Sequence, residues 1–290
     1  MRFTAFEENG QRGLAVEAAS GLRGLTEGEQ GYPGDLLSLI QGGPAALAAA
    51  HRRLGEGRVI DPTRIRYLPP LARPPKIICV GLNYAAHTEE SPYEQPSYPT
   101  VFLRVATTLI GHGAPIVRPL VSEQLDYEGE LVAVIGVGGR HIAKANALNH
   151  VVGYSIFNEA SIRDYQFKTP QWTVGKNFDN TGAFGPVFVT ADELPPGGKG
   201  LWLETRLNGQ VVQRANTNDM LFDVAEVISV LSEAMTLEPG DVIATGTPAG
   251  VGFGRRPPLY MKAGDTCVVE IERVGVLSNP IVDEAALKAA

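Results

Sequence analysis

The most informative segment is Glu123-Gln-Leu-Asp-Tyr-Glu-Gly-Glu130, which runs directly into the apolar residues Leu131-Val-Ala-Val-Ile135. A short apolar run of this kind is typical of a buried β-strand. If the strand spans residues 128–135, Glu128 and Glu130 are two positions apart and project from the same face. Two carboxylates on one face repel each other unless a cation or a proton lies between them. The segment therefore fits either a solvated strand edge or half of a metal site.

A third carboxylate follows another apolar run. Glu159 comes directly after Val151-Val-Gly-Tyr-Ser-Ile-Phe-Asn158. Oxygen-only ligation by Glu128, Glu130 and Glu159 suits Mg²⁺, Mn²⁺ or Ca²⁺ and suits Zn²⁺ poorly, because histidine and cysteine are absent from the set. Water or substrate oxygens would complete the coordination shell.

Three further polar residues follow Glu159. A helix is expected over residues 160–167, so Arg163 and Gln166 share one face and could grip a carboxylate or a carbonyl. Such pairs also occur on solvent-facing helix surfaces. Lys176 lies in the turn Gly175-Lys-Asn-Phe-Asp179. It could contact a substrate or an oxyanion, and a surface lysine is the alternative.

The loop after the expected strand 76–81 carries a histidine and a carboxylate. It runs Gly81-Leu-Asn-Tyr-Ala-Ala-His87-Thr-Glu-Glu90. If it turns helical near Ala85, His87 and Glu90 lie on one face, and the carboxylate orients the imidazole and raises its basicity. The alternative is a chance spacing of two surface residues.

A glycine-rich turn, Ala244-Thr-Gly-Thr-Pro-Ala-Gly-Val-Gly252, follows another expected strand. It lacks the Lys-Ser/Thr ending of a P-loop and the spacing of a dinucleotide fingerprint, which argues against nucleotide binding. Its backbone amides and the Thr247 hydroxyl could still hold a small anion.

Apolar runs separated by Gly, Pro, Asn and Asp predict a chain built mainly from strands. Strands are expected at 76–81, 100–104, 128–135, 151–157, 186–190, 202–207, 241–245 and 266–271. The pair Asn208-Gly209 predicts a hairpin between two of them. Helices are expected at 44–54, 160–167 and 220–235.

Residues 1–70 differ from the rest and predict a small N-terminal α/β module. The segment Leu68-Pro-Pro-Leu-Ala-Arg-Pro-Pro75 has four prolines in eight residues, which favours an extended connector. A larger catalytic domain is then expected over residues 74–285.

The composition narrows the function classes. The 290 residues are 44% hydrophobic and carry a net charge of −7 without a basic cluster, so nucleic acid is not expected as a partner. The start lacks the order of a secretory signal, and the apolar stretches are too short for a bilayer. A cytoplasmic protein without a membrane partner is expected, with Cys79 and Cys267 as buried reduced thiols.

Seven segments follow one another in a familiar order: GLNYAAHTEE, TVFLR, DYEGELVAVIG, GYSIFNEASIRDYQ, GKNFD, GDVIATGTPAGVG and PPLYMKAGDTCVVEIERVGVLSNPI. Together they resemble the fumarylacetoacetate hydrolase family over residues 74–282. The resemblance implies a β-rich α+β fold, a mixed β-sheet roll with a small N-terminal module, and a homodimer.

The resemblance also implies roles for single residues. Glu128, Glu130 and Glu159 match the family's ligands for Mg²⁺, Mn²⁺ or Ca²⁺, and Glu159 stands where aspartate is usual. The water-activating dyad is matched by His87 and Glu90. Positions that contact the substrate or its oxyanion are matched by Arg163, Gln166, Lys176 and Thr247. Arg104, expected in the substrate-binding set, stands where members commonly have lysine.

The activity implied is hydrolysis of a C–C bond in a 2,4-dioxo acid of the acylpyruvate, fumarylpyruvate or fumarylacetoacetate type. His87, oriented by Glu90, would activate a water that attacks the distal carbonyl, while Lys176 and Gln166 stabilise the oxyanion and the metal stabilises an enolate. The same platform serves an oxo-acid decarboxylase, tautomerase or hydratase. A member without catalysis, acting as a binding or structural dimer, is a third interpretation. Substrate identity is expected to depend on the loop 91–99.

Overall fold

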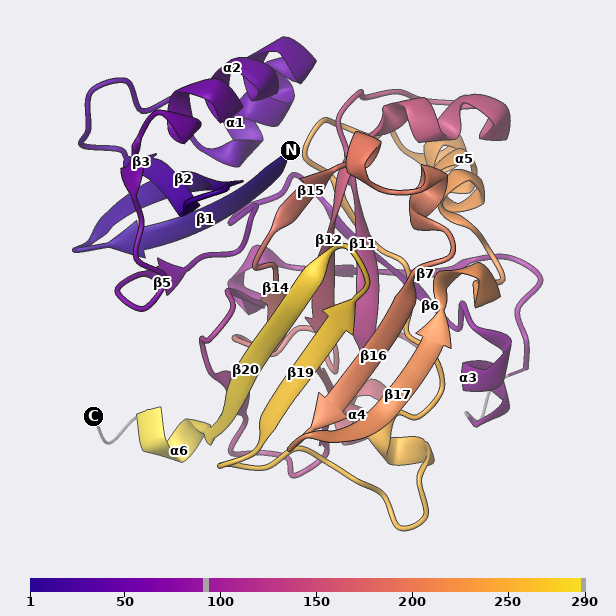
Figure 1. Cartoon of the computed structure of the whole chain (residues 1–290). Coiled ribbons are helices and arrows are strands. Elements are labelled where there is room, and N and C mark those ends of the chain that lie inside the picture. Colours follow the sequence, from indigo (N-terminus) through magenta and orange to yellow (C-terminus); the bar gives the residue numbers. More distant parts are fainter. Residues whose placement is uncertain (91–93, 288–290) are drawn as a thin grey trace.

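A computed structural model describes residues 1–90 and 94–287 as a strand-rich chain with few, short helices (Figure 1). Its large sheet has the strand order β4-β3-β2-β1-β15-β12-β11-β18-β6-β7, and β5, β8 and β14 pair with it off this path. The strands of this sheet are β1 (Arg2–Glu8), β2 (Gln11–Ala18), β3 (Gly21–Thr26), β4 (Arg58–Val59), β5 (Arg66–Tyr67), β6 (Ile77–Gly81), β7 (Thr100–Arg104), β8 (Leu109–Ile110), β11 (Gly129–Ile135), β12 (Val151–Glu159), β14 (Gly182–Phe184), β15 (Phe188–Thr190) and β18 (Val242–Ala244).

A second sheet packs against the large one and has the order β17-β16-β19-β20-β9. Its strands are β9 (Ile116–Arg118), β16 (Trp202–Leu207), β17 (Gln210–Asn216), β19 (Thr266–Ile271) and β20 (Gly275–Asp283), while β10 (Leu125–Asp126) pairs with β13 (Ser161–Ile162) alone. The predicted hairpin is confirmed: Asn208 and Gly209 join β16 to β17 with φ of 52° and 81°. Such positive φ values suit the asparagine–glycine pair.

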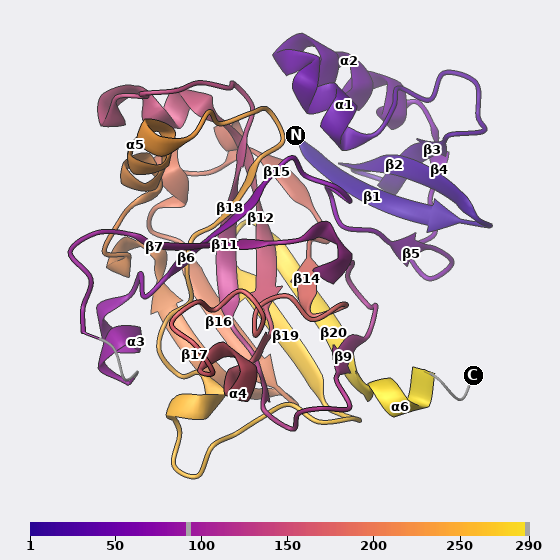
Figure 2. The same cartoon turned by 180° about the vertical axis from the view of Figure 1, so that it is seen from behind.

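The N-terminal strands extend the large sheet. Strand β1 pairs antiparallel with β15, through Arg2 with Val189 and Phe3 with Phe188. The helices α1 (Leu36–Gln41) and α2 (Gly43–Gly55) cover these strands at one corner of the molecule (Figure 2). The expected leading module is therefore joined to the rest by strand pairing as well as by the proline-rich connector.

Two of the predicted helices are shorter than their apolar patterns indicate. Helix α5 (Val224–Ala234) begins late because Asp223 caps it, with its carboxylate accepting the backbone N–H of Glu226 at 2.9 Å. Helix α4 (Arg163–Gln166) is a single turn because residues 161–162 form β13. Helix α3 (Ala85–Glu89) forms where the loop was considered to turn helical near Ala85, whereas α1 and α6 (Glu284–Leu287) were not expected.

The centre of the fold is the antiparallel pair β11 and β12. Every residue of β11 is buried. The register pairs Gly129 with Asn158 and Glu130 with Phe157, so the beginning of β11 lies beside the end of β12. The predicted mixed β-sheet fold is confirmed, and Cys79 and Cys267 are both buried free thiols. Within the described part of the chain, the helices are all too short or too polar to cross a membrane.

Candidate metal and active site

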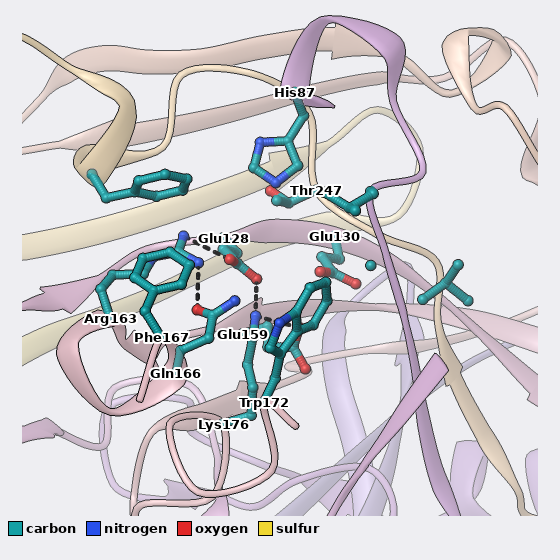
Figure 3. Close-up of a pocket in the computed structure, with 14 residues that line it drawn as sticks. His87, Glu128, Glu130, Glu159, Arg163, Gln166, Phe167, Trp172, Lys176 and Thr247 are labelled. Carbon is teal, nitrogen blue, oxygen red and sulfur yellow. Dashed lines mark hydrogen bonds and ion pairs between the residues drawn. The ribbon is translucent and has the colours of Figure 1, made fainter. Parts of the chain in front are cut away.

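Three buried carboxylates converge where β11 begins and β12 ends. One oxygen from each of Glu128, Glu130 and Glu159 lies within 4.8 Å of the others. The backbone N–H of Glu159 donates to the carbonyl of Glu128 at 2.8 Å, so strand pairing itself holds these two residues together. The side chains face one pocket (Figure 3). The structure thus brings together the three carboxylates that the sequence predicted as metal ligands, two from one expected strand and one from the end of another.

The electrostatics of this cluster fit a divalent cation. Burial, together with Glu159 and Glu128, raises the pKa of Glu130, and burial also raises the pKa of Glu159. Carboxylates buried together in this way are stabilised by a cation or by protons between them. Oxygen-only donors at this spacing suit a hard cation such as Mg²⁺ or Mn²⁺. Oε2 of Glu130 accepts the backbone N–H of Gly246 at 2.8 Å.

Lys176 lies against the carboxylates from the loop after α4. Its Nζ is 2.6 Å from Oε2 of Glu128 and 3.1 Å from Oε2 of Glu159. Burial opposes ionisation of Glu128, but Lys176 and Arg163 outweigh it and lower its pKa to about 2. Gly175 permits this close approach, because a Cβ there would lie 2.3 Å from the backbone nitrogen of Gln166.

Arg163 and Gln166 lie side by side on α4, as their spacing predicted. Nη1 of Arg163 donates to the Gln166 amide oxygen at 2.8 Å, and Nη2 lies 2.7 Å from Oε1 of Glu128. Both side chains line the pocket (Figure 3). The pair can therefore present N–H groups to a carboxylate or a carbonyl in the pocket.

Asp126 is a site residue that sequence reasoning missed. Its carboxylate is fully buried and accepts Nε of Arg163 at 2.8 Å and the backbone N–H groups of Gly252 and Phe253 at 2.7 and 2.9 Å. It thereby fixes both Arg163 and the glycine-rich loop. The sequence signal that could have identified Asp126 is its place in the motif Asp126-Tyr-Glu-Gly-Glu130. The motif does not reveal the distant residues that Asp126 contacts.

His87 and Glu90 form the predicted pair on and just after α3. Nδ1 of His87 is 2.9 Å from Oε1 of Glu90. Glu90 also accepts the backbone N–H of Gly250, at 3.0 Å to each carboxylate oxygen. A carboxylate at this distance favours the tautomer of His87 that donates from Nδ1, in which Nε2 is the ring nitrogen that can accept a proton. The ring lies across Glu128 from Lys176 (Figure 3).

Thr247 lines the pocket, but its hydroxyl already has protein partners. It donates to the carbonyl of Gly129 at 3.0 Å and accepts the amide of Gln213 at 2.8 Å. Gln213, which sequence reasoning missed, also accepts the N–H of Gly129 at 3.0 Å. These bonds tie the glycine-rich turn to the beginning of β11. The substrate-contact roles assigned to Thr247 and the other site residues stay predictions.

Arg104 lies behind the carboxylates. Its side chain is 0% exposed, and Nη1 is 3.7 Å from Oε1 of Glu159. Among the described residues that line the pocket, Arg104 is absent. The expectation that it contacts the substrate stays a prediction, and its observed neighbour is a proposed metal ligand.

Three aromatic side chains complete the pocket wall and were also missed. They are Phe167, Trp172 and Phe253. Phe167 and Phe253 stack edge to face at 5.4 Å, and the Arg163 guanidinium lies 4.5 Å from the Phe253 ring centroid. The aromatic residues occur singly, without a periodicity that would have marked them.

The loop 91–99 was expected to determine which substrate binds. Residues 91–93 of this loop lie outside the described residues.

Known proteins are similar to this chain in sequence and in fold. The family model described as fumarylacetoacetate (FAA) hydrolase C-terminal matches residues 76–282. The Rattus norvegicus protein named oxaloacetate tautomerase Fahd2a, mitochondrial, is 35% identical, over 97% of this chain and 92% of its own length.

Two solved structures are similar over nearly their whole length. A fumarylacetoacetate hydrolase from Exiguobacterium antarcticum is 39% identical with a TM-score of 0.84, covering 98% of this chain and 100% of its own. A maleylpyruvate hydrolase from Sphingobium sp. SYK-6, in complex with manganese(II) and pyruvate, is 27% identical with a TM-score of 0.81, covering 98% and 99%. The family model matches residues 76–282, which is most of the chain. The chain therefore belongs to the fumarylacetoacetate hydrolase family.

Proposed function

We propose that this protein is a metal-dependent enol–keto tautomerase of a short 2-oxo diacid of the oxaloacetate type. The observation that carries the proposal is His87, held by Glu90 at 2.9 Å and facing the cluster of Glu128, Glu130 and Glu159. A positioned base beside a cation site is the arrangement that proton transfer next to a carbonyl requires. The 35% identical Rattus relative named oxaloacetate tautomerase supports the choice of substrate class.

The proton moves through His87. In the tautomerisation the enol hydroxyl at C2 loses a proton and C3 gains one, so the overall proton count is unchanged. Nε2 of His87 accepts the hydroxyl proton and returns a proton to C3, while Glu90 stabilises the imidazolium in between. Arg163 and Gln166 bind a carboxylate of the substrate, which fixes C3 near the imidazole.

The cofactor is Mg²⁺ or Mn²⁺, with Ca²⁺ as a further candidate, held by Glu128, Glu130 and Glu159. When bound, the cation would supply positive charge beside the 2-oxo oxygen and the adjacent carboxylate. Manganese(II) in the structure of the similar maleylpyruvate hydrolase supports a divalent ion. Lys176 contributes a second positive charge to the same pocket.

Hydrolysis of a 2,4-dioxo acid is the second candidate. It is favoured by the 39% identical structure titled fumarylacetoacetate hydrolase and by the same His87, which could deprotonate a water instead of an enol. The two reactions differ in whether a C–C bond breaks, and decarboxylation differs from both by releasing CO₂.

One experiment separates these activities. Purified protein with Mn²⁺ is given the enol form of oxaloacetate, and in parallel a panel of acylpyruvates, with metal-only reactions as controls. Loss of the enol absorbance faster than with metal alone, without pyruvate, supports the tautomerase. Pyruvate from acylpyruvates supports the hydrolase, and CO₂ from oxaloacetate above the metal control supports a decarboxylase. No activity on any compound of the panel would contradict the proposal and would indicate a binding protein.

We further infer a homodimer, in line with the family resemblance. Large apolar side chains are exposed at Leu103, Val105 and Val174, which are 49%, 51% and 62% accessible. Asn177 bonds the backbone of Leu103 and Val105, so these residues lie near one another. A mass of twice the 31.0 kDa chain in light scattering would support the dimer. The cytoplasm stays the predicted compartment, although the Rattus relative is named mitochondrial.

A further inference from the structure

Arg104 ends strand β7 and lies wholly inside the protein. Its side chain is 0% exposed, and that of Glu159 is 1% exposed. Nη1 of Arg104 is 3.7 Å from Oε1 of Glu159. A buried arginine is costly unless its charge and its N–H groups find partners. Its position therefore depends on the carboxylate and on the neutral groups around it.

Those neutral groups hold the guanidinium in place. Nη2 donates to Oγ1 of Thr181 at 2.7 Å, Nε to Oγ1 of Thr108 at 3.4 Å, and Nη1 to the carbonyl of Ala160 at 3.3 Å. The ring of Phe157 lies 5.5 Å from the guanidinium carbon. With partners on three sides, Arg104 is a fixed positive charge that cannot follow Glu159 if the carboxylate moves.

The two oxygens of Glu159 face different groups. Oε2 is 3.1 Å from Nζ of Lys176, which also contacts Glu128, so this oxygen faces the carboxylate cluster. Oε1 lies 3.7 Å from Nη1 of Arg104, and the buried Cys79 thiol also interacts with the Glu159 carboxylate. The two oxygens therefore have different positively charged neighbours, Lys176 for Oε2 and Arg104 for Oε1.

We propose that Arg104 is a positioning residue that holds Oε1 of Glu159, so that Glu159 offers only one oxygen to a bound cation. Ca²⁺ takes six to eight oxygen ligands and often uses both oxygens of a carboxylate, whereas Mg²⁺ requires near-octahedral coordination at shorter distances. A carboxylate restricted to one oxygen therefore favours a small, six-coordinate cation, Mg²⁺ or Mn²⁺, over Ca²⁺. This inference rests on the metal site of the proposed function.

Cation binding without substrate tests the proposal. Dissociation constants for Mn²⁺ and Ca²⁺ are measured by calorimetry on the whole chain, in the wild type and in Arg104→Met. Freed Glu159 can bind through both oxygens, so the Ca²⁺-to-Mn²⁺ ratio of dissociation constants should fall about tenfold or more, within the range for outer partners of metal ligands. An Arg118→Met control, which breaks the 2.6 Å pair with Asp283 at the end of β20, should leave the ratio unchanged.

Two further variants show whether Arg104 acts through Glu159. Arg104→Lys keeps the charge and should retain most of the selectivity of the wild type. In a Glu159→Asp background, where the carboxylate is withdrawn by one methylene, Arg104→Met should change the ratio much less. Equal changes in both backgrounds, or an unchanged ratio in Arg104→Met, would overturn the inference. A wild type that binds neither cation would instead contradict the metal site itself, and thermal melting identifies a variant that fails to fold.

Discussion

Oε1 of Glu90 lies 2.9 Å from Nδ1 of His87, and the same carboxylate accepts the backbone N–H of Gly250. The pair therefore does more than orient an imidazole, because it links α3 to the glycine-rich turn after β18. Gly250 has a φ of 105°, and a Cβ there would lie 2.1 Å from the carbonyl oxygen of Val212. Only glycine can occupy this position and still offer its N–H to Glu90.

Replacing His87 by alanine should lower turnover by about 10²–10⁴-fold, which is the usual contribution of a general base. Mn²⁺ affinity should be nearly unchanged, because His87 is outside the carboxylate cluster. Steady-state kinetics and calorimetry provide the two readings. His150, whose Nδ1 bonds the carbonyl of Val137 at 2.7 Å, provides the control His150→Ala. Wild-type turnover in His87→Ala would remove His87 from the mechanism.

Asp126→Asn should weaken substrate binding and reduce stability. The asparagine removes the charge that Arg163 contacts at 2.8 Å and places an N–H₂ group among donors from Gly252 and Phe253. Removing one partner of a buried ion pair costs about 3–5 kcal/mol. KM should rise more than kcat falls, because Arg163 is the proposed carboxylate contact. An unchanged KM in a folded variant would show that Asp126 serves stability alone.

Gly175→Ala should disturb the site through the backbone. The new Cβ would lie 2.3 Å from the nitrogen and 2.5 Å from the Cα of Gln166, so α4 or the loop carrying Lys176 must shift. We expect a loss of about 1–3 kcal/mol, typical of overpacking, and lower activity. Gly55→Ala is the matched control, because a Cβ at Gly55 meets nothing within 4 Å. Equal melting temperatures for the two variants would contradict the tight contact seen here.

The effect of metal on stability should grow with pH. Burial raises the pKa of Glu130 and Glu159 above the ordinary 4.5. The contribution of these two groups to the free energy of unfolding is therefore fully present below pH 4.5 and is lost as pH rises through the raised pKa values. Glu128 has the opposite sign: its pKa of about 2 gives stability that is present above 4.5 and lost as pH falls toward 2.

The chelator-treated protein should therefore lose melting temperature relative to the Mn²⁺-loaded protein as pH rises above the ordinary carboxyl pKa of 4.5. The bound cation supplies the positive charge that the lost protons had provided, and calorimetry in two buffers should show protons released on Mn²⁺ binding. A melting difference that stays constant over this range would argue against protonated carboxylates in the metal-free cluster.

Much of the site could be predicted because its signals are local. His87 and Glu90 are three positions apart, and so are Arg163 and Gln166, so the geometry of a helical turn places each pair together. Glu128 and Glu130 flank Gly129, the first residue of β11. The hairpin at Asn208-Gly209 follows from the backbone freedom of those two residues. Helix ends were less predictable because caps such as Asp223 and competing strand pairing decided them.

The strand-rich composition, the turns and the candidate ligands follow from the amino-acid sequence alone, because they depend on residues close together in the chain. Contacts between distant groups appear only in the folded molecule. Asp126 contacts residues 252–253, Arg104 contacts Glu159, and β1 extends the sheet beside β15. These contacts come from the register of paired strands and the packing of loops, which bring together segments that no local spacing relates.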